Sequence, residues 1–182
     1  MNEIGRPPGT WGRYDDVAER YERFQASNGY AALAADLVAA LSLMPGASVL
    51  DVGCGTGAAT VAAQKAVGAR GLVLGLDVSL AMLRRAAAAG VGHLVVGTVP
   101  GLPFRDRSFD RVAATLVLSH VERYDAALRD MVRLLKPGGR LGVSAGAKRP
   151  NPPNVAYQAW EATAESVVGR EALHEAATRV VP

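Results

Sequence analysis

The sequence predicts an α/β fold, in which a doubly wound, mostly parallel sheet carries helices on both faces. Two observations favour this class. Short apolar runs, typical of strands buried on both faces, alternate with helical stretches between residues 46 and 147. A glycine-rich segment, "GCGTG" at 53–57, directly follows the first run, where a parallel strand would turn into its helix. With 182 residues, the chain is expected to build one sizeable core.

Each expected element has a local signal. Glycines end the first two core helices, Ser79 is a suitable N-cap for the second, and Pro45 in "MPGA" ends the helix before the sheet. The expected strands are residues 48–52, 71–78, 93–97, about 110–119 and 140–146, the last following the turn "KPGG". The expected helices are residues 30–41, 55–68, 80–89, about 124–135 and about 155–177, with a further helical pattern at Val17, Tyr21 and Phe24.

These elements suggest three regions. Residues 1–45 are expected to form a helical lid or substrate segment, in which Tyr14 and Tyr21 either cover a ligand or pack in the core. Residues 46–147 form the ligand-binding core, and residues 148–182 form a C-terminal helical segment.

The composition narrows the class of protein. Apolar residues make up 49% of the chain and charged residues 20%, as in ordinary globular proteins. The net charge of +3 is spread along the chain, so no nucleic-acid partner is expected. The longest apolar stretch is interrupted by Asp36 and Pro45, so no membrane span is expected. The single cysteine, Cys54, has no partner for a disulfide or a metal site, and this fits a cytoplasmic protein without a metal.

The glycines at 53, 55 and 57 indicate a ligand. Residues without a Cβ permit both a tight turn and a close approach of the backbone to a bound molecule. The helix that begins near Gly57 would direct its free N–H groups at an anionic group, a carboxylate or a phosphate. A turn that is merely tight is the alternative interpretation.

Asp77 supports the interpretation as a ligand site. It closes the next strand about twenty residues beyond Gly57, where a carboxylate accepts the hydroxyls of a ribose. The alternative is a charge that stabilises the N-terminus of the following helix. Together, the glycines and Asp77 favour a nucleoside with an anionic arm.

Four motifs in order carry a family resemblance: "VLDVGCGTG", "GLDVSLAML", "LPFRDRSFD" and "LLKPGGRL". Over about residues 14 to 145, the chain resembles the class I S-adenosylmethionine-dependent methyltransferases of type 11, the ubiquinone/menaquinone-biosynthesis-like branch. The resemblance implies a Rossmann-like sheet of seven strands. Because only five are visible, the chain is expected to lack the last two, and its fifth strand would need cover from the final helix or from a second subunit in a homodimer.

The resemblance also implies site residues. The loop with Gly53, Gly55 and Gly57 would pack against the methionine part of the cofactor, with Asp51 near its ammonium group. Asp77 would bind the ribose, and Val78 and Met82 would flank the adenine. Thr98 and Val99 stand where the family often has an aspartate for the adenine amino group. The implied cofactor-binding set is Asp51, Gly53, Cys54, Gly55, Gly57, Asp77, Val78, Met82, Thr98 and Val99.

His120 is the candidate catalytic residue, because related enzymes often have a histidine after the fourth strand, where it could accept a proton from a substrate hydroxyl. Its alternative role is to cap the next helix or line the pocket.

The expected function is methyl transfer from S-adenosylmethionine to a small-molecule acceptor. A catalytically silent binding or scaffold protein is the alternative. A nucleotide-linked oxidoreductase is disfavoured, since the glycine spacing is Gly-x-Gly-x-Gly and not Gly-x-Gly-x-x-Gly.

Overall fold

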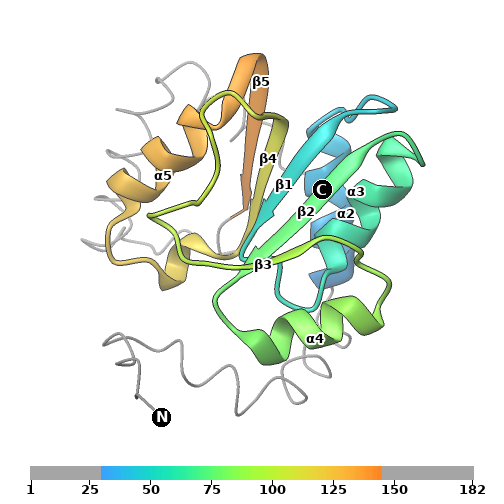
Figure 1. Ribbon diagram of the computed structural model, residues 1–182, viewed down its shortest axis with the longest axis horizontal. Coiled ribbons are helices and arrows are strands. Elements are labelled where there is room, and N and C mark those ends of the chain that lie inside the picture. Colours follow the sequence, from blue (N-terminus) through green and yellow to red (C-terminus); the bar gives the residue numbers. More distant parts are fainter. Residues whose placement is uncertain (1–29, 145–182) are drawn as a thin grey trace, which may run out of the picture.

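The structure, a computed structural model, describes residues 30–144. Within this part of the chain, a five-stranded parallel sheet has the order β3-β2-β1-β4-β5 (Figure 1). The α/β fold expected from the sequence is therefore confirmed. The strands are β1 (Ser48–Val52), β2 (Leu72–Asp77), β3 (Leu94–Val96), β4 (Phe109–Thr115) and β5 (Leu135–Ser144).

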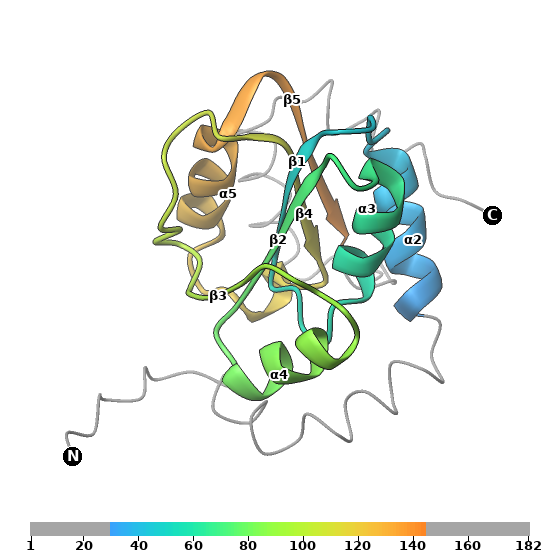
Figure 2. The same ribbon diagram turned by 45° about the vertical axis from the view of Figure 1, so that its right-hand side comes forward.

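Helices cover both faces of the sheet. One face is covered by α2 and α3 and the other by α5, while α4 lies along β2 and β3 (Figures 1 and 2). The helices are α2 (Tyr30–Ala40), α3 (Ala58–Val67), α4 (Leu80–Ala88) and α5 (Tyr124–Arg133), with a 3₁₀ helix, η1 (Leu118–His120), before α5.

The central strand β1 shows why the sheet needs both layers. Val49 packs with Ala34 and Val38 of α2, while Leu50 and Val52 belong to the core on the α5 side. Residues 49, 50 and 52 are completely buried. Alternating side chains therefore fill two separate cores, and this accounts for the continuous apolar run in the sequence.

The helix boundaries follow the expected caps. The Ser79 side chain accepts a hydrogen bond from the Met82 N–H at the start of α4, at 3.2 Å. Gly68 ends α3 with a φ of 68°, and its N–H donates to the Gln64 carbonyl. Both caps predicted from the sequence are confirmed.

Two strand boundaries differ from expectation. β4 ends at Thr115 because Leu116 takes a φ of 58° and donates its N–H to the Ser144 carbonyl, and the chain then turns into η1. β5 begins at Leu135, before the expected turn, since the "KPGG" residues form an irregularity within the strand. The register passes from Phe109↔Leu135 to Arg111↔Arg140, so the additional residues of β5 bulge out of the ladder.

A polar cluster joins three strands at their amino-terminal ends. Asp110 Oδ2 accepts from the Ser48 hydroxyl at 2.6 Å, the Ser48 N–H at 2.8 Å and the Lys136 ammonium at 2.9 Å. The cluster joins the beginnings of β1, β4 and β5 by side-chain hydrogen bonds. We refer to Ser48, Asp110 and Lys136 as the amino-edge cluster.

Some expectations lie outside the described residues. These are the helical patterns around Val17, Tyr21 and Phe24, the role of Tyr14, and the helix expected at 155–177. The three-region division at residues 45 and 148 stays a prediction. Among residues 30–144, no helix has the length and apolar character needed to cross a bilayer.

Candidate cofactor-binding site

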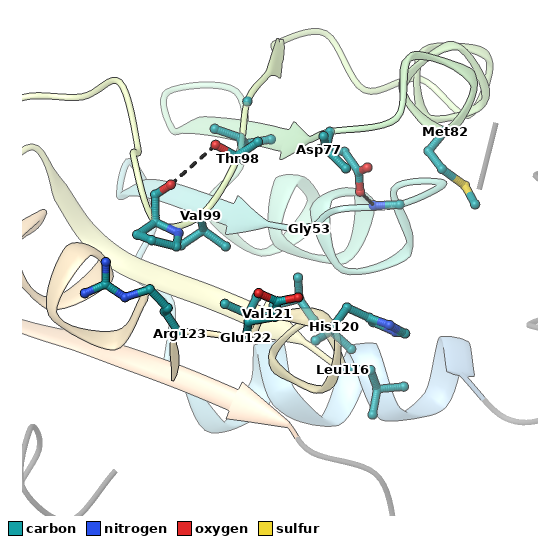
Figure 3. A pocket seen from close by; sticks show the side chains of 17 residues that line it. Gly53, Asp77, Met82, Thr98, Val99, Leu116, His120, Val121, Glu122 and Arg123 are labelled. Carbon is teal, nitrogen blue, oxygen red and sulfur yellow. Dashed lines mark hydrogen bonds between the residues drawn. The ribbon is translucent and has the colours of Figure 1, made fainter. Parts of the chain in front are cut away.

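A cavity of about 410 Å³ opens at the carboxyl ends of the strands (Figure 3). It lies where the strand order reverses, because β1 leads to β2 and β3 on one side and pairs with β4 on the other. Ligands of open parallel sheets bind in the crevice at this kind of reversal. Its lining comes from the segments that follow β1, β2, β3 and β4.

The loop after β1 needs glycine for two different reasons. A Cβ on Gly53 would lie 2.3 Å from Val117 Cγ2, so a side chain there would collide with the opposite loop. A Cβ on Gly55 would meet no atom within 4 Å, since Gly55 borders the open cavity. Both residues also have positive φ angles, 68° and 54°. The space beside Gly55 is therefore open to the cavity.

Asp77 joins this loop to the end of β2. Its Oδ2 accepts from the Gly55 N–H at 2.8 Å, and its Oδ1 accepts from the Ser79 N–H at 2.9 Å. The half-buried carboxylate lines the cavity. Because each carboxylate oxygen has two acceptor positions, Asp77 can hold the loop and still accept hydrogen bonds from a ligand.

Asp51 lies beneath the loop and does not line the cavity. It is 1% exposed, and its Oδ2 accepts from the Thr60 hydroxyl at 2.6 Å. Within residues 30–144, its Oδ1 has no hydrogen-bond partner. Burial first of all, and the nearby Asp77 charge, raise the pKa of Asp51 from 3.8 to about 7 against the lowering effect of Thr60.

Cys54 and Gly57 also lie behind the cavity wall. Cys54 is buried, and burial raises the pKa of its thiol far above the ordinary value, so it is suited to packing and not to nucleophilic attack. Gly57 starts α3, and a Cβ there would lie 2.9 Å from Val91 Cγ2. Cys54 and Gly57 therefore pack beneath the loop and do not contact the cavity.

The segment after β4 forms the opposite wall. Figure 3 shows His120, Val121 and Glu122 across the cavity from Asp77 and Thr98. Burial of His120 lowers the pKa of its imidazole below 6.5, so the ring favours its neutral form. A neutral imidazole can accept a proton from a bound substrate.

The segment after β3 forms the third part of the wall. Gly97, Thr98, Val99 and Pro100 line the cavity, and the Thr98 hydroxyl donates to the Pro100 carbonyl at 3.3 Å. Thr98 therefore presents a hydroxyl, not a carboxylate, at this side of the cavity.

The structure brings most of the predicted site residues to one cavity. Those that line it are Gly53, Gly55, Asp77, Val78, Met82, Thr98, Val99 and His120, while Asp51, Cys54 and Gly57 lie behind the wall. Sequence reasoning missed Leu76, Gly97, Pro100 and Thr115, and it missed residues 116–117 and 121–123, which line the cavity on either side of His120. No motif marked the residues around His120, although their position just before it and just after it was a usable signal. In the described part of the chain, no three His, Cys, Asp or Glu side chains gather as a metal site would require.

Comparisons with known proteins agree with this geometry. A family model described as "Methyltransferase domain" matches residues 50–143, so the chain belongs to the methyltransferase domain family, type 11. The family resemblance found in the motifs is thereby confirmed.

Individual relatives carry more specific names. The demethylmenaquinone methyltransferase of Staphylococcus haemolyticus is 46% identical over 100 residues, which are 53% of this chain and 42% of that protein. The enzyme of the same name from Staphylococcus epidermidis is 35% identical over 133 residues, 69% of this chain and 55% of that protein. The chain thus spans about half the length of these curated relatives.

A solved structure supports the fold. A SAM-dependent methyltransferase from Thermotoga maritima superposes with a TM-score of 0.63 at 27% identity, covering 86% of this chain and 70% of that one. The Rossmann-like fold class predicted for the core is confirmed.

Proposed function

We propose that this chain binds S-adenosylmethionine and transfers its methyl group to a small-molecule acceptor. The observation that carries the proposal is the pairing of Asp77 with Gly55: a carboxylate at the end of β2 holds a glycine loop that leaves space open beside it. The family match and the name of the Thermotoga maritima neighbour support the choice of cofactor.

The cavity residues suit the parts of this cofactor. Asp77 has acceptor capacity for ribose hydroxyls, and the apolar Val78 and Met82 beside it suit the adenine ring. The loop at Gly53 and Gly55 would receive the methionine part. Asp51, with its unpartnered Oδ1 just beneath the loop, adds a carboxyl group on the side where an ammonium would lie.

The chemistry requires few protein groups. When bound, S-adenosylmethionine would supply an electrophilic methyl group, which would pass to the acceptor atom as the bond from sulfur to the methyl carbon breaks, with S-adenosylhomocysteine as the leaving group. The protein aligns the two reactants and excludes water, and this alignment is a large part of the rate enhancement. We propose that His120 accepts the proton of an acceptor hydroxyl and that Val121 and Glu122 help to form the acceptor side of the cavity.

The residues that line the cavity suggest the class of methyl acceptor. The wall is mainly apolar with a few polar groups, as is usual for sites of small organic molecules. Demethylmenaquinone, named in the relatives, is the first acceptor to test. The cytoplasmic location expected from the single cysteine, and the homodimer, stay predictions.

A calorimetric titration of the full chain tests the cofactor. The ligands are S-adenosylmethionine, S-adenosylhomocysteine and NAD, and the variants are Asp77→Asn and, as the matched control, Asp36→Asn on the exposed side of α2. We expect both S-adenosyl ligands to bind the wild type and Asp36→Asn and to bind Asp77→Asn at least about tenfold more weakly, since a charged acceptor is lost. NAD should not bind.

Methyl transfer is tested separately. Labelled S-adenosylmethionine is incubated with the chain and a set of hydroxylated quinone-type acceptors, and transfer of the label is measured. Binding with no transfer to any acceptor would favour the silent scaffold. Absence of S-adenosyl binding by a cooperatively folded sample would overturn the proposed function.

A further inference from the structure

The connection between β3 and β4 runs beside α5 before it returns to the sheet (Figure 1). Its first residues, 97–100, form one wall of the cavity. The residues directly before α5, 120–123, form the opposite wall. The helix α5 is therefore the element through which the two walls can be held at a fixed separation.

Asp130 on α5 binds the backbone of this connection. Its Oδ2 accepts from the Gly101 N–H at 2.6 Å and from the Leu102 N–H at 2.7 Å. The Asp130 side chain is only 11% exposed. Hydrogen bonds from two neighbouring amides to one carboxylate are of the stronger, charge-assisted kind.

Arg133, one turn further along α5, binds the same connection. Its Nε donates to Asp130 Oδ1 at 2.7 Å, and its Nη2 donates to the Leu102 carbonyl at 2.7 Å. Its Nη1 donates to the Phe104 carbonyl and to Asp106 Oδ1, both at 2.8 Å. A planar guanidinium can satisfy all these acceptors at once, which an ammonium cannot do.

From these contacts we propose that Asp130 and Arg133, together the α5 clamp, are positioning residues that fix the 97–100 wall against the 120–123 wall and so set the width of the cofactor cavity. The inference rests on the proposed function, because the cavity is taken to hold S-adenosylmethionine. Neither residue lines the cavity, so the clamp acts through the connection.

The 97–100 wall depends on this support because of its own composition. Thr98 is exposed, and its hydroxyl is directed to the Pro100 carbonyl. Without a carboxylate at 98 or 99, this wall can recognise a ligand only through its shape, its backbone groups and one hydroxyl. Recognition of that kind is lost when the wall shifts, because short-range contacts and hydrogen bonds tolerate little displacement.

Two clamp variants and one control separate positioning from general stability. Asp130→Asn removes the charge and places an amide NH2 where an acceptor is needed, and Arg133→Lys keeps the charge but loses the planar fork. The control is Arg129→Lys, also on α5, whose side chain is 60% exposed and pairs with Asp125. All three variants change a charged side chain of α5. Of the three residues, only Asp130 and Arg133 form hydrogen bonds with the connection between β3 and β4.

The first measurement is amide hydrogen exchange on the full chain without ligand. We expect exchange of the Gly101 and Leu102 amides to rise at least about tenfold in Asp130→Asn and to stay unchanged in Arg129→Lys, since both amides lose their charge-assisted hydrogen bonds. Amides of β1 report on global stability and should keep their protection in all variants.

The second measurement is the dissociation constant for S-adenosylmethionine. We expect it to rise about tenfold in Asp130→Asn and in Arg133→Lys, with the wild-type value in Arg129→Lys. Equal affinity of the wild type and both clamp variants would overturn the inference while leaving the proposed function intact. A wild type that binds no S-adenosylmethionine would overturn the proposed function and the inference with it. If Asp130→Asn does not fold, Arg133→Lys decides the question.

Discussion

The backbone of Gly53 lies directly against Val117, so that a Cβ on residue 53 would be 2.3 Å from Val117 Cγ2. The loops after β1 and β4 therefore interlock at the base of the cavity. Gly53→Ala should cost about 2 to 5 kcal/mol of stability, because it combines a left-handed backbone strain with overpacking. Chemical unfolding measures this loss.

Two other glycines serve as controls for this prediction. A Cβ on Gly46 or Gly55 meets no atom within 4 Å, while both residues have positive φ. Each alanine variant should therefore cost only about 1 to 2 kcal/mol. Gly55→Ala should in addition weaken S-adenosylmethionine binding, since its methyl group enters the cavity, whereas Gly46→Ala should not. Equal stability losses at 46 and 53 would show that the Val117 contact is not important.

Asp51 should make the stability of the protein fall as pH rises. Its pKa is raised by burial from 3.8 in the unfolded chain to about 7 in the folded one, so the folded state binds the proton more tightly between these values. This group then lowers the free energy of unfolding as pH rises from about 4 to 7, by at most about 4 kcal/mol. Asp51→Asn should remove that part of the pH dependence.

Urea unfolding at pH 4.5, 6 and 8 tests this prediction, with Asp36→Asn as an exposed control. The wild type and the control should share one slope with pH, and Asp51→Asn should gain stability relative to them at pH 8. Identical pH profiles for all three proteins would mean that Asp51 titrates in the native state as in an unfolded chain.

Asp110 should contribute the opposite pH dependence. Hydrogen bonds from Ser48, first of all, and the nearby Lys136 lower the pKa of Asp110 to about 2. A carboxyl group with a depressed pKa stabilises the fold above its unfolded value and loses this contribution as pH falls from about 4 to 2. The stability difference between wild type and Asp110→Asn should therefore be present at pH 6 and shrink toward pH 2. A constant difference across that range would contradict the assignment.

The pH dependence of methyl transfer should show whether His120 acts as a base. The pKa of the imidazole is lowered by burial, so the neutral base is available at pH 7 and is lost only below 6.5. His120→Gln should lower the single-turnover rate by about 10²-fold or more and abolish the acidic limb of the profile, with S-adenosylmethionine affinity retained. If the variant keeps both the rate and the limb, His120 merely lines the cavity.

The central part of the fold could be predicted because its signals are local. The strand at 48–52, its glycine loop and the cap at Ser79 each depend on a few neighbouring residues, and the structure confirms them. The position of Asp77 followed from the same reasoning, since parallel strands place their carboxyl ends at one edge.

The remaining features depend on contacts between distant segments. Asp130 binds amides 28 and 29 residues earlier in the chain, and nothing in the helical pattern of α5 indicates this. The end of β4 was misplaced for another reason, because Leu116 takes a left-handed backbone conformation that its residue type does not signal. Asp51 was expected near the ammonium group of the cofactor; the structure shows that it is buried, accepts a hydrogen bond from Thr60 and does not line the cavity.

The amino-edge cluster of Ser48, Asp110 and Lys136 lies at the end of the sheet opposite to the cavity. The strands are thus aligned by side-chain hydrogen bonds at one end of the sheet, and the cavity opens at the other end. The residues that keep the strands in register are separate from the residues that line the cavity. Substitutions at exposed lining residues such as Glu122 and Arg123 should therefore change ligand preference and leave the strand register unchanged.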